Sequence, residues 1–208
     1  MQQWNNIYKG KKEVWNGIQE DFPKILALFN KYNVKRVLDL GCGSGRHTVY
    51  FAKKGFDVYG IDIAEEGINA TKDLLKKERL QADLKTGSMY NLLPYPDSFF
   101  DAVISTQTIH HGDIKNIKNV IKEIERILRP KGLIFITIRK KRYDKDKYKK
   151  ISHREYIKIA GEEKGLIHYL FNKDLLKKEF KGFKILDIWT ESNKIFYCLL
   201  GELKVKKR

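Results

Sequence analysis

Short apolar runs alternate with amphipathic segments along most of this chain, and that alternation limits the folds it can adopt. It is the pattern of βαβ units, in which helices cover both faces of a parallel sheet. Because no helical segment separates the last two runs, these should pair as an antiparallel hairpin. The sequence therefore predicts an α/β fold: a doubly wound, mostly parallel seven-stranded sheet with one antiparallel strand near the edge. Its strands are expected at 36–40, 57–62, 83–86, 100–105, 133–137, 183–190 and 195–200.

The amphipathic segments supply the helices between these strands. Apolar residues recur at helical spacing in 64–77, 114–128 and 175–180. The sequence Glu20-Asp21-Phe22-Pro23 predicts a helix start, with acidic residues in its first turn. Residues 129–132 (Arg-Pro-Lys-Gly) predict a turn before the fifth strand.

Length and composition favour one folded domain over residues 1–208. Hydrophobic residues make up 42% of the 208, so a sizeable core can form and disorder of the whole chain is excluded. No apolar run approaches the ~18 residues of a membrane helix, and segment 1–12 has no apolar signal core. Cys42 and Cys198 are too few for a disulfide scaffold. We therefore expect a soluble, cytoplasmic protein, monomeric or homodimeric, without a membrane partner.

The strong positive charge of the chain fits two interpretations. Lysine and arginine number 42 against 26 acidic residues, which gives a net charge of +16 and a pI near 9.6. Such a composition is typical of thermophile surfaces rich in ion pairs and also of proteins that bind nucleic acid. Basic residues concentrate at 139–158 and 204–208, where a solvated surface is the commoner explanation.

A glycine-rich loop, 41–45, follows the first predicted strand. In open α/β sheets, ligands bind beyond the carboxyl ends of the strands. Gly41, Gly43 and Gly45 allow the backbone to approach a ligand closely, and free N–H groups at the next helix start attract anionic groups. Asp62 ends the second strand, where a carboxylate can accept both hydrogens of a ribose diol. Together these features indicate a ligand that contains a ribose.

The glycine spacing distinguishes between two such ligands. A dinucleotide fingerprint is G-x-G-x-x-G, whereas this loop is G-x-G-x-G. Segment 37–46 resembles motif I of the class I S-adenosylmethionine (SAM)-dependent methyltransferases, and 60–63 resembles their acidic-strand motif. Segments 92–101 and 125–132 resemble the family's motifs that precede strands four and five. Segment 45–52 resembles the corresponding segment of the family's small-molecule enzymes of the tellurite-resistance type. The resemblance covers most of the chain and implies a Rossmann-like methyltransferase fold with SAM as cofactor.

The resemblance also implies which residues hold that cofactor. Arg46 would pair with the methionine carboxylate of SAM or face solvent, and Met89 would contact the ligand or pack in the core. Many family members carry an acidic residue at the position of Ser88, where it accepts a hydrogen bond from the adenine amino group. Here the Ser88 hydroxyl or a backbone group would have to accept that bond. An N-terminal helical cap, 1–33, would cover the ligand or only anchor a helix. The expected cofactor-binding residues are Asp39, Gly41, Cys42, Gly43, Gly45, Arg46, Asp62, Ile63, Ser88, Met89, Thr106, Trp4 and Tyr8.

The expected reaction is an in-line displacement that moves the SAM methyl group to a small-molecule acceptor. By the resemblance it needs no metal, because a sulfonium is already a good leaving group and the protein has only to position the reactants. His110 and His111 follow the fourth strand, where methyltransferases of this fold face the acceptor, and each is either a general base or a packing or loop contact. No metal site is expected, since adjacent histidines cannot easily share one ion and no further ligands converge in the sequence.

Residues 139–172 interrupt the connection after the fifth strand and are expected to form a substrate lid. Gly161 to Gly165 predicts an exposed turn. Glu162, His168 and Tyr169 are the expected substrate contacts, and a lid whose polar groups only satisfy local hydrogen bonds fits the same pattern.

Two other functions fit parts of the sequence. Residues 109–111 (Ile-His-His) resemble the strand-four region of wobble-uridine tRNA methyltransferases, and the basic segment could contact phosphates. RNA is not favoured, because the sequence has no appended RNA-binding module and no interleaving of aromatic and basic residues. A catalytically silent SAM-binding subunit is the other alternative, and the intact motifs argue against it.

Overall fold

The computed structural model describes residues 2–9, 17–140 and 145–205; the basic residues at 141–144 and 206–208 lie outside this part of the chain. Its main sheet has seven strands in the order β3-β2-β1-β4-β5-β10-β9. The strands are β1 (Arg36–Leu40), β2 (Asp57–Asp62), β3 (Asp83–Thr86), β4 (Phe100–Thr106), β5 (Leu128–Arg139), β9 (Phe183–Thr190) and β10 (Phe196–Leu203). Strand β10 is antiparallel to both of its neighbours, and the other pairs are parallel. The predicted α/β sheet with one antiparallel strand near the edge is confirmed.

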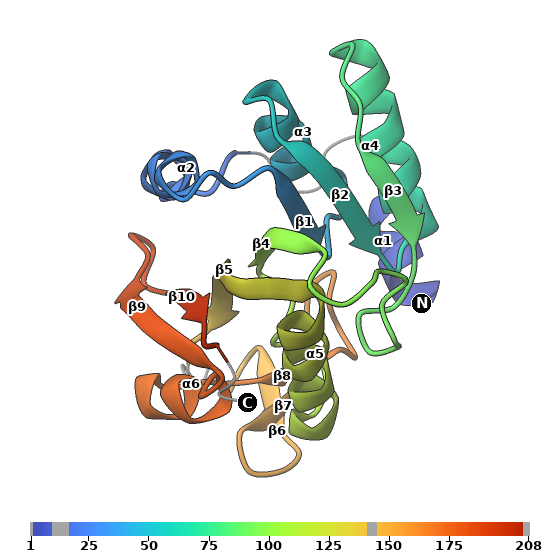
Figure 1. Cartoon of the computed structure of the whole chain (residues 1–208). Coiled ribbons are helices and arrows are strands. Elements are labelled where there is room, and N and C mark those ends of the chain that lie inside the picture. Colours follow the sequence, from blue (N-terminus) through green and yellow to red (C-terminus); the bar gives the residue numbers. More distant parts are fainter. Residues whose placement is uncertain (1, 10–16, 141–144, 206–208) are drawn as a thin grey trace.

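Helices cover both faces of this sheet (Figure 1). On one face lie α2 (Phe22–Lys31) and α3 (Arg46–Lys53), and on the other α5 (Ile114–Ile127) and α6 (Lys173–Glu179). Successive strand residues face opposite sides of the sheet. In β4, Ile104 belongs to the same hydrophobic cluster as Phe22 of α2, whereas Val103 belongs to the cluster that contains Ile121 of α5. Helix α4 (Glu65–Lys77) follows β2, and α1 (Gln2–Tyr8) packs against it. The strands are apolar on both faces because both faces are covered.

The start of α2 differs in detail from the prediction. The helix begins at Phe22, so Glu20 and Asp21 precede its first turn. Glu20 accepts hydrogen bonds from the backbone N–H and the hydroxyl of Ser192, and Asp21 accepts one from the Trp189 indole at 3.0 Å. The two acidic residues therefore bind the β9–β10 hairpin instead of the helix N-terminus.

The predicted turn at 129–132 is wrong. Strand β5 begins at Leu128, directly after α5, and its pairing with β4 shifts register between Phe100 and Ala102. Lys131 adopts a left-handed backbone conformation, with φ +63°. The chain therefore changes direction within an irregular first part of the strand, and regular pairing follows from Leu133.

A second, three-stranded sheet lies in the segment expected to be a lid. Its antiparallel strands are β6 (Tyr148–Lys150), β7 (Glu155–Lys158) and β8 (Ile167–Tyr169), and the predicted turn at 161–165 connects β7 to β8. An antiparallel bridge between His111 and His168 joins β8 to the loop after β4. Figure 1 shows this small sheet on the same side of the main sheet as α5. Among the described helices, none has the length and apolar character needed to cross a bilayer.

Candidate active site

A pocket opens at the carboxyl ends of β1, β2, β3 and β4, and it measures about 920 Å³ when the space open to solvent is included. All of the predicted cofactor residues except Asp39 and Gly45 line it. Residues that were not predicted as individual site residues also line the pocket: Ser44, His47, Ile61, Gly87, Tyr90, Gln107, Thr108 and Glu163. The pocket therefore lies where the glycine loop and the end of the second strand predicted a ligand.

The glycine loop is shaped by two side chains that lie against its backbone, those of Asp62 and Tyr8. Gly43 has φ +55°, and its N–H donates a hydrogen bond of 2.8 Å to Oδ2 of Asp62. A Cβ atom at this position would overlap the hydroxyl oxygen of Tyr8, so a larger residue does not fit beneath α1. Glycine is therefore required both by the conformation and by the close approach of Tyr8.

Asp62 presents a buried carboxylate to the pocket, with 9% of the residue exposed. Its Oδ1 accepts a hydrogen bond of 2.8 Å from the Ala64 N–H, and its Oδ2 accepts the bond from Gly43. Burial raises the pKa of Asp62, and these backbone N–H groups oppose the rise. Because a carboxylate has about four acceptor positions, both oxygens can accept further bonds. A pair of hydroxyl donors, such as the ribose diol of SAM, fits this carboxylate.

Asp39 and Gly45 support the loop from behind and do not line the pocket. Asp39 is fully buried, and its Oδ2 accepts a hydrogen bond of 2.8 Å from the Thr48 hydroxyl in α3. Burial raises the pKa of Asp39 to about 7. Gly45 precedes α3 with φ +84° and lies against Thr71 of α4. The side chain of Asp39 is directed toward α3 beneath the loop, which covers it.

The wall formed by α3 and the end of β4 is polar. The Thr106 hydroxyl is hydrogen-bonded to Nδ1 of His47 at 2.8 Å, and burial lowers the pKa of His47. Arg46 lines the pocket and donates a hydrogen bond of 3.2 Å to the Gly17 carbonyl. Burial also lowers the pKa of Arg46. Arg46 is therefore half-buried at the pocket and does not simply face solvent.

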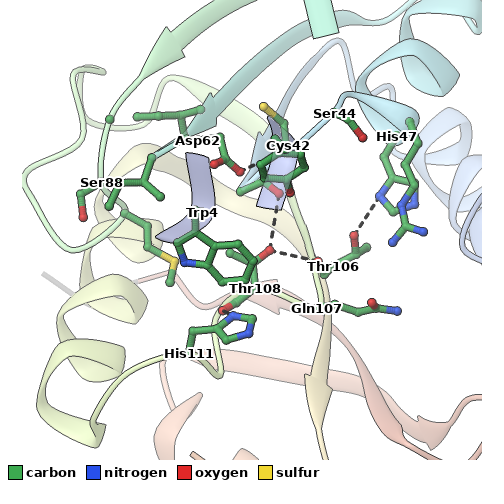
Figure 2. Close-up of a pocket in the computed structure, with 18 of the residues that line it drawn as sticks. Trp4, Cys42, Ser44, His47, Asp62, Ser88, Thr106, Gln107, Thr108 and His111 are labelled. Atoms are coloured by element: carbon green, nitrogen blue, oxygen red, sulfur yellow. Dashed lines mark hydrogen bonds between the residues drawn. The ribbon is translucent and has the colours of Figure 1, made fainter. Parts of the chain in front are cut away.

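Helix α1 covers the pocket with two aromatic side chains. Tyr8 is buried, and the Trp4 ring meets the His111 ring edge to face at 4.9 Å between centroids. In Figure 2 the Trp4 indole lies between the Asp62 carboxylate and the His111 ring. Both side chains line the pocket, which is the placement expected of a lid over a ligand.

The two candidate histidines after β4 have different surroundings. His111 lines the pocket; its Nδ1 is hydrogen-bonded to the Thr108 carbonyl at 2.8 Å, and the Tyr90 hydroxyl donates to the backbone carbonyl of His111. His110 is buried against Phe196 and does not line the pocket, and burial lowers its pKa. Only His111 of this pair can therefore face an acceptor.

The insertion reaches the pocket through Glu163, whereas the sequence pointed to Glu162. Glu162 is exposed in the turn, and its neighbour turns inward. Burial would raise the pKa of Glu163, but the neighbouring His111 and the hydrogen bond from Lys158 hold it below the usual range; Lys158 Nζ lies 2.6 Å from Oε2. A shift by one residue within a turn leaves no signal in the sequence.

The other two expected substrate contacts do not line the pocket. His168 is buried behind it, where burial and the neighbouring His111 lower the pKa of His168 to about 3. Tyr169 packs against Phe171 at 5.0 Å between ring centroids, in the core beneath α5 and α6. Strand alternation explains the outcome for Tyr169, because consecutive residues of β8 face opposite sides.

Sequence comparisons agree with this geometry. A family model described as a methyltransferase domain matches residues 38–136. The chain is 32% identical over 103 residues to a ubiquinone biosynthesis O-methyltransferase of Dechloromonas aromatica, covering 50% of this chain and 44% of that protein. It is 31% identical over 152 residues to a fatty-acid O-methyltransferase of Mycolicibacterium smegmatis, covering 62% and 53%. The chain thus spans about half the length of these curated relatives.

Solved structures show the same fold. A SAM-dependent methyltransferase of Methanosarcina mazei superposes with a TM-score of 0.75 at 22% identity, covering 86% of this chain and 98% of that one. TehB of Haemophilus influenzae gives a TM-score of 0.68 at 19% identity, covering 97% and 67%. Fold and pocket define a Rossmann-like α/β protein with its ligand site at the carboxyl edge of the sheet. The matched sequence motifs identify the family within this class of fold: the chain belongs to the class I SAM-dependent methyltransferase family.

Proposed function

We propose that this protein transfers the methyl group of SAM to a small-molecule acceptor. The observation that carries the proposal is the buried Asp62 carboxylate, held by backbone N–H groups beside the glycine loop and open to the pocket. A ribose diol would satisfy its remaining acceptor positions. Among ligands that contain a ribose, SAM is the one we assign to this pocket, because the chain belongs to the methyltransferase family.

The residues of the chain position the reactants. SAM, when bound, supplies a methyl group already activated on a sulfonium. Asp62 accepts hydrogen bonds from the ribose, and Arg46 stands within the same pocket for a carboxylate. Trp4 and Tyr8 cover the ligand and exclude water. Holding acceptor and methyl group in line contributes up to ~7–11 kcal/mol, so positioning by these residues can supply most of the catalysis.

A small acceptor is favoured by what surrounds the pocket. Helix α1 covers it from one side, and the insertion closes it from another through Glu163. The relatives above carry names of enzymes that methylate a ubiquinone precursor and fatty acids, which are small molecules. A nucleotide held within tRNA would have to pass the same aromatic lid.

The test of cofactor binding is a calorimetric titration with SAM. Asp62→Ala should weaken SAM binding by about tenfold or more, because it removes hydrogen bonds to a charged acceptor. Asp57→Ala is the matched control: this exposed aspartate begins the same strand at the far end from the pocket, and its variant should bind like the parent. If Asp62→Ala binds SAM as well as Asp57→Ala does, the ribose assignment is wrong.

The test of the acceptor class is methyl uptake from labelled SAM. Thiols, amines, carboxylates and bulk tRNA are offered in parallel to the parent and to Asp62→Ala. We expect label in one class of small molecule, with less in the variant. Label in tRNA alone would overturn the small-molecule assignment and favour the RNA-modifying alternative.

A further inference from the structure

Three of the five histidines of the chain meet between the loop after β4 and strand β8. His110, His111 and His168 each offer a ring nitrogen, and these three nitrogens lie within 4.8 Å of one another. Their residues are 2%, 7% and 0% exposed. Adjacent histidines cannot easily share one ion, but the ring centroids of His110 and His111 are only 4.3 Å apart here, and His168 joins them from the insertion.

The hydrogen bonding of His111 fixes which of its nitrogens is available. A carbonyl oxygen only accepts, so the 2.8 Å contact with the Thr108 carbonyl places a proton on Nδ1. In the neutral ring Nε2 then carries a lone pair, and this nitrogen faces Oε1 of Glu163 at 3.7 Å. His168 Nε2 lies 3.5 Å from Oε2 of the same carboxylate. Electron-rich atoms converge here, and a positive charge between them would stabilise the cluster.

Three more ring nitrogens of the cluster are buried without a hydrogen-bond partner among the described residues. Nδ1 of His110 and both nitrogens of His168 make no hydrogen bond to any described residue. Buried polar atoms in native proteins nearly always have a partner, and each one that lacks a partner costs roughly 1–3 kcal/mol. Several such atoms in one place point to a group that binds them.

We propose that His110, His111, His168 and Glu163 bind a divalent transition-metal cation, for which zinc is the best candidate. Three imidazoles and one carboxylate are a typical donor set for zinc. Metal-bound histidines usually donate their second N–H to a carbonyl or a carboxylate, which is the arrangement of His111. Lys158, at 2.6 Å from Oε2 of Glu163, would orient this ligand and leave Oε1 for the ion.

The backbone already holds the three histidine ligands together. The Tyr169 N–H donates to the His110 carbonyl and the Gly112 N–H to the Ile167 carbonyl, both at 2.8 Å, on either side of the His111–His168 bridge. Zinc–nitrogen bonds of about 2.0–2.1 Å place ligand nitrogens roughly 3.4 Å apart in a tetrahedral site. The rings therefore have to close by something on the order of 1 Å, within reach of side-chain rotation.

A bound ion would change the role of His111. A ring whose Nε2 is ligated cannot accept a proton there, so this inference assigns His111 to metal binding instead of to general-base catalysis. Because His111 and Glu163 line the pocket while His110 and His168 lie behind it, the ion would sit in the pocket wall that faces the acceptor. The competing explanation is a proton shared between His111 and Glu163, with no metal.

The experiment measures metal binding without SAM, so it does not depend on the proposed function. Protein prepared without a polyhistidine tag is stripped with a chelator and titrated with Zn²⁺, and with Co²⁺ as a spectroscopic probe. We expect one equivalent of either ion, with visible absorption bands of tetrahedral Co²⁺. His168→Asn and Glu163→Gln should weaken binding about tenfold or more. His153→Ala, which removes an exposed histidine outside the cluster, should bind like the parent.

Thermal unfolding and SAM titration control for misfolding of the variants. Zn²⁺ should raise the melting temperature of the parent and of His153→Ala, and raise it less in the two cluster variants. No uptake of either ion by the folded parent would overturn the proposal, and so would equal uptake by the parent and His168→Asn. Loss of SAM binding in Asp62→Ala together with unchanged metal uptake would separate the two sites.

Discussion

The large and small sheets hold their parts of the pocket by different means. The large sheet is buried on both faces by two extensive hydrophobic clusters, which fix the carboxyl ends of β1, β2 and β4. The strands of the small sheet have only three or four residues, and its own cluster contains Tyr148, Tyr156 and Leu170. The small sheet is therefore positioned by its attachment to the loop after β4 and by Tyr169, which packs in the core of the large sheet.

This difference corresponds to two kinds of binding surface. On the side of the large sheet the pocket is lined by the glycine loop and by the Asp62 carboxylate, which suit a ligand common to the family. On the side of the small sheet it presents His111 and Glu163, whose positions depend on contacts between distant segments. We therefore propose that the large sheet holds the cofactor and that the insertion selects the acceptor.

The largest effect should come from the core of the large sheet. Phe22 is fully buried among the rings of His47, Phe51 and Phe135, so Phe22→Ala should cost about 3–5 kcal/mol of the free energy of unfolding. Leu170→Ala should instead accelerate hydrogen exchange in β6–β8 and leave exchange in β1–β5 unchanged. Urea unfolding and exchange mass spectrometry measure both. Equal exchange changes in the two sheets after Leu170→Ala would show that they unfold as one unit.

The glycine loop gives a sharper test of the large-sheet side. In Gly43→Ala the new Cβ would overlap the Tyr8 hydroxyl, and we expect SAM binding to weaken about 100-fold, or by about 2.7 kcal/mol. Gly55→Ala is the control, because Gly55 also has a positive φ but no atom lies within 4 Å of the place that its new Cβ would take. Both variants strain the backbone, and only the first should change the calorimetric titration. Equal affinities would mean that the Tyr8 contact does not shape the site.

A smaller effect is expected in the pH dependence of stability. The folded-state pKa of Asp39 is about 7, above the ordinary value of 3.8, so folding favours the protonated form. Its contribution to stability is full below pH 3.8 and is lost as the pH rises towards 7, by about 1.4 kcal/mol for each pH unit. Asp39→Asn should therefore gain stability relative to the parent between pH 5 and pH 7. Urea unfolding measures the difference, and Asp57→Asn, at an exposed site, should show none.

Local patterns explain why so much of the large sheet could be predicted. Each strand and helix there depends on apolar spacing within a short window, and the loop at 41–45 carries its own glycines. The errors at 129–132 and at Glu20 and Asp21 concern element ends, where pairing with distant residues decides the conformation. The pocket-lining residues His47 and Gln107 follow predicted motifs but have no residue signal of their own.

The sequence by itself determined the doubly wound sheet, the glycine loop and the carboxylate that ends the second strand, because each is encoded by neighbouring residues. Only the tertiary structure decided that Glu163 and not Glu162 enters the pocket, and that His168 joins His110 and His111. The physical reason is pairing between distant segments. The register between His111 and His168 sets which histidines meet, and the conformation of the turn between β7 and β8 sets which glutamate points inward.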